Sequence, residues 1–443
     1  MKPVRFLVLL FAVFCLSPVG AETTPNVLVI MVDDLGYADL GCQGSADIRT
    51  PNIDALAASG VRFAAGYVPA SVCGPSRACF ITGQYSVEFG INGNGASTSG
   101  IPHEQKTIAE HLKMSGRSYY TAAIGKWHLG HSDDQTPMAR GFDHFLGFLG
   151  GSSDYFMFDA KAGKKEQVIQ RNSDVLGLGD LPPETYLTDL FTDEAVSLLR
   201  GDHGRGNKPF FMYLAYNAPH GPLQAPEVYQ QRNHHIADKK RRTFAAMMTG
   251  VDDGVGRVMT ALEEEGLRET TLVVFLSDNG GPTRVNTSLN TPFRGFKGNT
   301  WEGGVRVPFM ASWPGTIEGG RVIDEKIFSI DLAPTILKLA GCEVPLEIDG
   351  IDLLPWLTGA QETLPERDFY FWRGSARGLL FGTKKYTRNK GAGVEFFDLA
   401  ENPQEDPEHQ LIDPEVRTSL ETRAQQWEAS WPPAIDSEDD EPE

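Results

Sequence analysis

The run from Cys73 to Gly83, Cys-Gly-Pro-Ser-Arg-Ala-Cys-Phe-Ile-Thr-Gly, limits what this chain can fold into more than any other stretch. Pro75 suits the first turn of a helix, because proline has no N–H group to lose there. Gly83 can end that helix with a left-handed cap. The Cys73 sulfur is therefore predicted to lie at a helix N-terminus, where the dipole favours an anion and where Arg77 can point its donor fork.

Apolar runs that alternate with helical stretches predict a largely parallel sheet covered by helices on both faces. The sequence predicts strands over residues 26–32, 119–124, 209–215 and 271–276, and helices over 53–59, 107–114 and 244–265. Beyond residue 359, strand-like runs over 369–372, 378–386 and 394–399 precede a helix over 414–427. We therefore expect an α/β chain with a large domain over residues 22–360 and a small C-terminal α+β subdomain over 361–435.

Polar residues follow each predicted strand of the large sheet. The carboxyl ends of strands in an open α/β sheet meet at one edge, where ligands gather. Carboxylate and amide oxygens at this edge suit a hard cation such as Ca²⁺ or Mg²⁺, which would relieve repulsion among the carboxylates. Either acidic dipeptide alone favours an ordinary capping or turn role, but both together favour a metal site. The residues that follow the strands are Asp33, Asp34, Lys126, His128, His220, Asp278 and Asn279.

Basic residues near the same edge have ordinary alternatives. Lys126 and His128 are two residues apart, so on an extended segment they project to the same side. Lys297 lies in the glycine-rich run 291–304, which is predicted to be a loop that lets backbone approach a ligand. Taken singly, Lys297 favours a solvated surface charge and His220 a structural role. The basic run 239–242 could attract a polyanion, although a solvated helix start is the favoured interpretation.

The run from Cys73 to Gly83 resembles the signature Cys-x-Pro-Ser-Arg-x-x-x-Leu-Thr-Gly of the type I sulfatases, with Ile81 in place of leucine. The spacing of the polar residues from Asp33 to Lys297 is also similar to that family's site, and the C-terminal region fits more loosely. The resemblance implies an alkaline-phosphatase-like fold, with a large mixed, mostly parallel sheet between helices and a smaller C-terminal antiparallel sheet with a helix. It implies hydrolysis of sulfate esters, with a galactose- or hexosamine-containing sulfated carbohydrate as the expected substrate.

The resemblance also implies a covalent modification and a role for each polar residue. A separate formylglycine-generating, or sulfatase-maturing, enzyme would oxidise Cys73 to formylglycine, the nucleophile. The lysines would neutralise sulfate oxygens, His220 would protonate the departing alcohol, and His128 would help to expel the sulfate. Ser152 or Ser153 could contact the sulfate. The implied catalytic residues are Cys73, Arg77, Lys126, His128, His220 and Lys297, and the implied ligands of Ca²⁺, or of Mg²⁺, are Asp33, Asp34, Cys73, Asp278 and Asn279.

Other functions stay open at this point. A phosphonate monoester or phosphodiester hydrolase can use the same site, because sulfate and phosphate are nearly isosteric. A non-catalytic binder of sulfated glycans would keep its cysteine unmodified. A metal-binding export protein is a further alternative, which the cluster of lysines and histidines disfavours.

The chain ends, the net charge and the cysteines indicate where the protein is located and which partners are excluded. Residues 1–21 combine a basic start, an apolar run and a small-residue cleavage site, which predicts a signal peptide and a periplasmic or secreted protein without a stable membrane anchor. Residues 436–443 form an acidic tail that we expect to be disordered. The net charge of −19 argues against a nucleic acid partner. Cys42, Cys79 and Cys342 are too few for a disulfide scaffold, so we expect reduced thiols.

Overall fold

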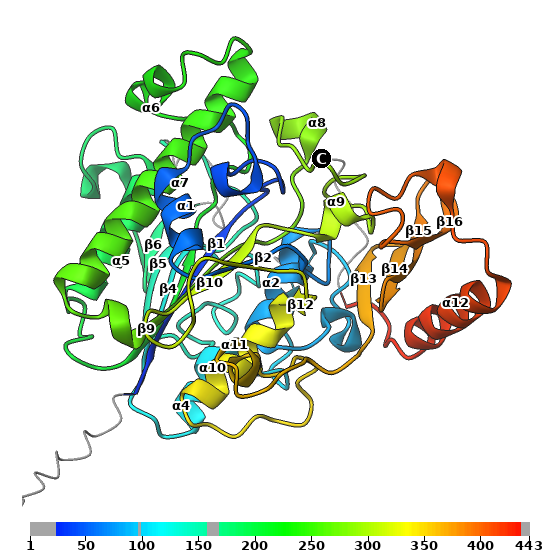
Figure 1. The fold of residues 1–443 in the computed structure, drawn as a ribbon. Coiled ribbons are helices and arrows are strands. Elements are labelled where there is room, and N and C mark those ends of the chain that lie inside the picture. Colours follow the sequence, from blue (N-terminus) through cyan, green and yellow to red (C-terminus); the bar gives the residue numbers. More distant parts are fainter. Residues whose placement is uncertain (1–23, 96–98, 157–167, 436–443) are drawn as a thin grey trace, which may run out of the picture.

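The computed structural model describes residues 24–95, 99–156 and 168–435, so the predicted signal peptide and acidic tail lie outside the described residues. Its centre is a mixed ten-stranded sheet (Figure 1) with the order β11-β2-β10-β9-β1-β8-β4-β5-β6-β7. The strands are β1 (Asn26–Val32), β2 (Val61–Phe63), β4 (Tyr120–Lys126), β5 (His144–Phe148), β6 (Gln170–Arg171), β7 (Asp174–Val175), β8 (Phe210–Ala215), β9 (Thr271–Ser277), β10 (Phe309–Ser312) and β11 (Arg321–Ile323). A separate pair joins β3 (Gly66–Tyr67) to β12 (Ile327–Phe328).

The predicted strands are the parallel core of this sheet. β1 pairs in parallel with β8 and β9, and β4 pairs in parallel with β8 and β5. The prediction for β4 stopped two residues early, because Gly125 and Lys126 continue the strand to the polar edge. The parallel arrangement brings the carboxyl ends of β1, β4, β8 and β9 to the same side, as the sequence predicted.

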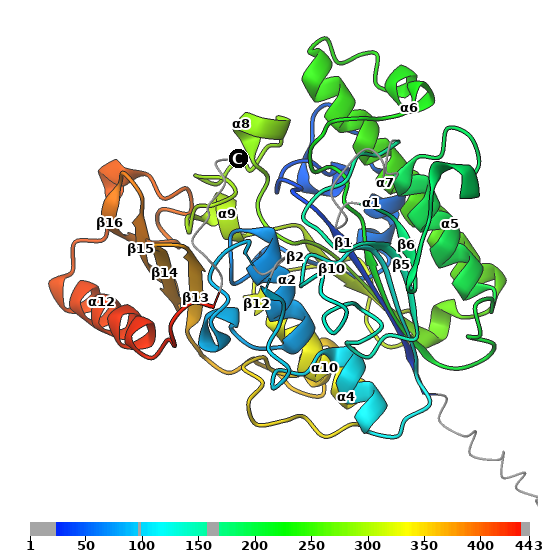
Figure 2. The ribbon, with the colours of Figure 1, turned by 180° about the vertical axis from the view of Figure 1, so that it is seen from behind.

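Helices cover both faces of the sheet, and alternate residues of β1 enter opposite cores. Val29 packs with the side that carries α2, α4 and α10, whereas Ile30 packs with the side that carries α1, α5 and α7 (Figures 1 and 2). This alternation is the two-residue period of a strand buried on both faces. The helices are α1 (Pro51–Ala58), α2 (Cys73–Thr82), α4 (Ile108–Met114), α5 (Leu187–Leu199), α6 (Glu227–Arg232), α7 (Lys239–Glu264), α8 (Thr283–Asn286), α9 (Glu302–Val305), α10 (Leu332–Leu339), α11 (Leu354–Leu357) and α12 (Pro414–Ala429).

The C-terminal region forms a four-stranded antiparallel sheet that packs against α12. Its strands are β13 (Phe369–Arg373), β14 (Ala376–Phe381), β15 (Lys384–Asn389) and β16 (Gly393–Asp398). The sequence predicted a single run over 378–386, which is wrong: Gly382 has a φ of 55° and turns this stretch into the hairpin of β14 and β15. In the described part of the chain, no helix is long and apolar enough to cross a bilayer.

A buried ion network joins the C-terminal sheet to the loop that carries Lys297. Lys385 of β15 donates to Glu302 at the start of α9 (2.6 Å) and lies 2.9 Å from Glu405. All three side chains are fully buried, and the Tyr67 hydroxyl donates to the second oxygen of Glu302 (2.7 Å). Burial opposes the charge of Lys385, but the attraction of Glu302 and Glu405 raises its pKa. The lysine is therefore the positive centre that lets two carboxylates share this interior.

We expect Lys385→Met to destabilise the protein by about 3–5 kcal/mol, because its removal leaves the buried Glu405 without a counter-charge and leaves Glu302 paired with Arg306 alone. The matched control is Lys384→Met, the preceding residue, whose ammonium is partly exposed and pairs with Asp398 on the surface. It should cost no more than about 1 kcal/mol. Urea unfolding of both variants measures the difference. Equal free energies of unfolding in the two variants would show that the buried network carries no net stabilisation.

Candidate active site

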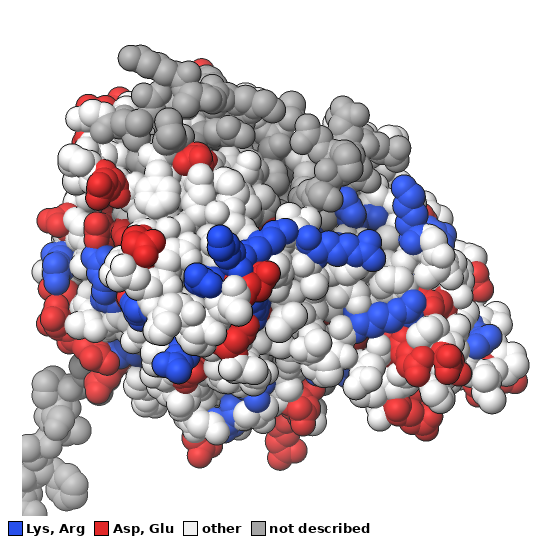
Figure 3. Space-filling model, turned by 90° about the horizontal axis from the view of Figure 1, so that it is seen from above, with Lys and Arg blue, Asp and Glu red and all other residues white. Residues whose placement is uncertain are grey.

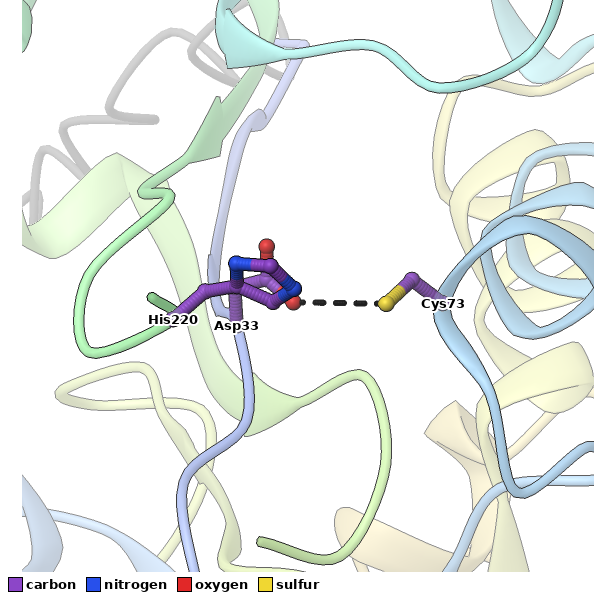
Figure 4. A group of neighbouring side chains, drawn as sticks. All are labelled: Asp33, Cys73 and His220. Atoms are coloured by element: carbon purple, nitrogen blue, oxygen red, sulfur yellow. Dashed lines mark hydrogen bonds between the residues drawn. The ribbon is translucent and has the colours of Figure 1, made fainter. Parts of the chain in front are cut away.

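The predicted helix at Cys73 is present and begins at that residue. α2 spans Cys73–Thr82, and Gly83 ends it with a φ of 74° while its N–H donates to the carbonyl of Cys79 (2.8 Å). The Cys73 sulfur lies 3.5 Å from an oxygen of Asp33, and His220 approaches the same carboxylate from the segment after β8 (Figure 4). The helix start is thereby aimed at the ends of the parallel strands.

Three buried carboxylates meet at this edge. Asp33 and Asp34 follow β1, Asp278 follows β9, and single oxygens of the three lie within 4.8 Å of one another. Asp34 adopts a left-handed conformation (φ 69°), and its backbone N–H donates to Asp278 (3.2 Å). Buried carboxylates at this separation repel one another strongly unless positive charge lies between or beside them.

The amide of Asn279 fits the same requirement for a cation. Its Nδ2 donates to Asp34 (2.6 Å), but its Oδ1 is buried without a hydrogen-bond partner among the described residues. A buried carbonyl oxygen without a donor is costly, and a hard cation is an ordinary partner for it. The residues present therefore fit a Ca²⁺ or Mg²⁺ ion, held by oxygens of Asp33, Asp34, Asp278 and Asn279.

Basic side chains surround the carboxylates. Lys126 donates to Asp33 (2.6 Å), and Lys297 lies 3.0 Å from Asp34; both lysines are buried. Arg77 donates through Nε to Asp278 (2.9 Å), and its Nη2 lies 2.8 Å from the same oxygen. Lys297 is therefore not the solvated surface charge that was its ordinary alternative, because the glycine-rich loop folds inward and buries its ammonium. The structure brings all three predicted cations to the carboxylates.

Burial and neighbouring charges shift the pKa values of the acidic groups in different directions. Burial alone would raise the pKa of Asp33, but the attraction of Lys126, with help from His220 and Arg77, lowers it. Burial and the negative charge of Asp33 raise the pKa of Asp278 to about 7. Burial also raises the pKa of the Cys73 thiol well above its ordinary value, and the nearby carboxylates add to the effect. An unmodified Cys73 is therefore a neutral thiol and a poor nucleophile at neutral pH.

The two predicted histidines occupy different positions. His220 is partly exposed, with Nε2 3.6 Å from Asp34 and Nδ1 2.7 Å from the carbonyl of Gly221. His128 is buried, and its Nδ1 has no hydrogen-bond partner among the described residues. Burial, followed by the charges of Lys126 and Arg77, lowers the pKa of His128 well below its ordinary value. His128 is therefore a buried neutral base, whereas His220 lies partly open to solvent.

The extended geometry assumed for Lys126 and His128 does not hold. β4 ends at Lys126, and His128 has a φ of 61°, which is a left-handed conformation rather than a strand. The Nε2 of His128 faces Gly151, where an added Cβ would lie 2.8 Å away. The histidine thus reaches the site through a turn, and a residue with a side chain at position 151 would crowd it.

Tyrosines complete the site, and the sequence analysis missed both. The Tyr213 hydroxyl accepts a hydrogen bond from Arg77 (3.1 Å), and the Tyr155 hydroxyl donates to the carbonyls of Asn217 (2.7 Å) and His220 (2.9 Å). Tyr213 fixes the guanidinium of Arg77, and Tyr155 fixes the segment that carries His220. A tyrosine inside the apolar run 209–215 was the available signal, since a buried hydroxyl needs a polar partner.

Two further groups of residues were named from the sequence, and a contact of Ser152 or Ser153 with sulfate stays a prediction. Ser153 is buried and donates to the carbonyl of Asp154 (3.4 Å), and Ser152 is half-buried. The basic run 239–242 does start a helix, α7, with Asp238 as its N-cap. Arg241 is not solvated, however: it is buried and pairs with Asp39 and Asp47.

Comparison with known proteins finds similar sequences and a similar fold. The sulfatase family model matches residues 25–342. The chain is 32% identical to mouse (Mus musculus) N-acetylgalactosamine-6-sulfatase over 83% of this chain and 72% of that protein, and 37% identical to human (Homo sapiens) arylsulfatase A over 79% and 70%. It is also similar to the solved structure of Ps i-CgsB in complex with k-i-k-neocarrahexaose, with 33% identity, a TM-score of 0.84 and coverage of 92% of this chain and 93% of that one.

The raised pKa of Asp278 gives a pH-dependent prediction for the protein without divalent cation. Its folded pKa of about 7 lies above the ordinary aspartate value of 3.8, so its contribution to stability is fully present below pH 3.8 and is lost as the pH rises through 7. Asp278→Asn should remove this loss. We expect the free energy of unfolding of the wild type, measured in chelator, to fall relative to that of the variant between these pH values.

Adding Ca²⁺ at pH 7 provides the second arm of the same test. It should raise the melting temperature of the wild type, because an ion bound only by the folded state stabilises it, and raise that of Asp278→Asn much less. Parallel pH profiles for the two proteins, or equal calcium effects, would contradict the metal assignment. Calorimetry at each pH supplies both readings.

Proposed function

This chain belongs to the sulfatase family and is a sulfuric ester hydrolase, and we propose that it removes sulfate from a sulfated carbohydrate. One observation carries the assignment of the site: the start of α2 places Cys73 against buried carboxylates, with Lys126 and Lys297 on the same edge. Support for a carbohydrate comes from relatives named for sulfated sugars, including a neighbour solved with a carrageenan oligosaccharide. The apolar start of the chain supports export to the periplasm or the exterior.

Residue 73 is the proposed nucleophile in its formylglycine form, and the carboxylates are the proposed holders of Ca²⁺, with Mg²⁺ as the alternative. When both groups are in place, they supply a hydroxyl of lowered pKa next to the sulfate. The position of Cys73 at the start of α2, with its sulfur 3.5 Å from an oxygen of Asp33, supports this proposal. Arg77, held by Asp278 and Tyr213, orients residue 73 from the next turn of α2.

Lys126 and Lys297 are the proposed binders of the sulfate oxygens. Both ammonium groups are buried and lie beside the carboxylates, so their charge acts in a medium that screens it weakly. Burial opposes the charge of Lys126, but Asp33 raises its pKa, so it stays protonated. Fixed positive groups of this kind stabilise the charge that develops as the sulfur–oxygen bond breaks.

The histidines divide the proton transfers in our proposal. His220 is partly exposed, as a residue that protonates a departing alcohol at the mouth of the site must be. His128 is a neutral base that can take a proton from residue 73 while sulfate is released. The competing activity is hydrolysis of phosphonate monoesters or phosphodiesters. Turnover of an aryl sulfate and of the matching aryl phosphodiester by the same preparation distinguishes the two.

Cys73→Ala should abolish hydrolysis of an aryl sulfate while leaving the fold intact. Alanine is tolerated at a helix start, but no nucleophile remains. We expect the activity to fall below a few per cent of wild type, with an unchanged melting temperature in the presence of Ca²⁺. A matched control is Cys79→Ala in the same helix, a free buried cysteine away from the carboxylates, which should keep its activity even if it loses some stability. Substantial turnover by Cys73→Ala would overturn the assignment.

His220→Ala and His128→Ala should differ in kinetics. General-acid catalysis contributes about 10²–10⁴-fold, and nitrophenolate hardly needs a proton. His220→Ala should therefore slow sugar sulfates much more than nitrophenyl sulfate. His128→Ala should give a burst of released alcohol followed by slow turnover, equal for both substrates. Stopped-flow measurement of alcohol release tests both variants, and equal losses on the two substrates with no burst would contradict these roles.

A further inference from the structure

A groove on the surface between α6 and the start of α7 carries surplus positive charge. It has a volume of about 380 Å³, and its charged lining consists of Lys239, Arg242 and Glu227, with Gln230, Gln231 and His234 among its polar walls. Glu227 accepts a hydrogen bond from Gln231. Among the described residues, neither Lys239 nor Arg242 has a carboxylate within ion-pair distance. The groove therefore presents cations that the protein itself leaves without a counter-charge.

Another surface groove of similar size is balanced. The groove between α5 and α7 is lined by Arg200 and Arg257, but Glu264 pairs with the first and Asp193 with the second. Such pairing is what a chain of net charge −19 should produce, because carboxylates outnumber cations on its surface. Figure 3 shows the molecule from above, the side on which α6 and α8 lie in Figure 1, and Lys and Arg side chains cross the middle of that face.

The positive residues at the start of α7 do not stabilise that helix. Lys239, Lys240 and Arg242 lie in the first turn, where the positive end of the helix dipole disfavours cations. Arg241 in the same run is accounted for by its buried pairs with Asp39 and Asp47. Arg242 donates to the carbonyls of Ile236 and Ala237, which fixes its guanidinium beside the groove. Residues that break a local stability rule often serve binding.

The groove lies close to the proposed catalytic residues along the chain. Ala225, one of its lining residues, is five residues after His220, and five residues span at most about 18 Å. The connecting segment is held in place, because Tyr186 donates to the carbonyl of Gln224 (3.1 Å) and Tyr155 holds the carbonyl of His220. An extended anionic chain can therefore lie in the groove while one of its sulfates occupies the site.

We propose that this groove binds a second, non-reacting sulfated portion of the same polysaccharide, and so favours polymers over small sulfate esters. The inference rests on the proposed function, which it extends from a sulfate ester to a chain of sulfated sugars. Lys239 and Arg242 supply the charge, and Gln230 and Gln231 supply amide groups for sugar hydroxyls. These residues do not take part in the chemical step.

The test uses the double variant Lys239→Ala, Arg242→Gln in the full-length matured enzyme. The value of kcat/KM on a sulfated galactan should fall about three- to tenfold, the range expected for losing exposed charge pairs. The value on nitrophenyl sulfate should stay unchanged. Lys239→Glu alone, which keeps the backbone contacts of Arg242, should produce a loss on the polymer in the same direction, and both losses should shrink at high salt.

The matched control is Arg200→Ala, Arg257→Gln, which removes the same charge from the balanced groove and should change neither value. Equal effects on polymer and small ester, or no effect on either, would overturn the inference. Affinity for the galactan, measured by calorimetry in the Cys73→Ala background, needs no turnover. If the wild type hydrolyses no sulfate ester, the proposed function is wrong. If the groove variants bind the galactan as tightly as the protein with the intact groove, the proposed role of the groove is wrong, whatever the activity.

Discussion

The site depends on the burial of three carboxylates within 4.8 Å of one another. Asp33, Asp34 and Asp278 are almost completely inaccessible, so water cannot screen their repulsion. Positive side chains lie beside these carboxylates: lysines from β4 and from the glycine-rich loop, and an arginine from α2. The orphaned oxygen of Asn279 indicates that one more positive partner, a divalent cation, belongs among them. Such an excess of buried charge is costly for folding and useful for attacking an anionic ester.

The same charges determine which chemistry is open to residue 73. Burial raises the pKa of the Cys73 thiol, and Asp33 and Asp278 add to the effect, so the thiol is neutral when no cation is bound. In the proposed function, a bound cation would lower the pKa of a hydroxyl on the modified residue, while the buried lysines would neutralise the sulfate oxygens.

The local parts of the fold could be predicted from the sequence. The apolar runs gave the parallel strands, Pro75 and Gly83 bounded α2, and the residues after each strand gave most of the site. What could not be predicted depends on contacts between distant segments. Three such contacts join residues more than eighty positions apart: Arg77 with Tyr213, Lys385 with Glu302, and Arg241 with Asp39. Arg241 also lies in a basic run whose composition suggests exposure to solvent. The turn at Gly382 was missed although the glycine inside the run 378–386 was a turn signal in the sequence.

The central claim is that residue 73 acts only after its sulfur has been replaced by an aldehyde oxygen beside the carboxylates. The most direct measurement is mass spectrometry of the peptide containing residue 73, made on preparations with different degrees of conversion, together with the specific activity of each. Activity should rise in proportion to the converted fraction, on a line through the origin. Full activity in a preparation whose Cys73 is entirely unmodified would contradict the claim.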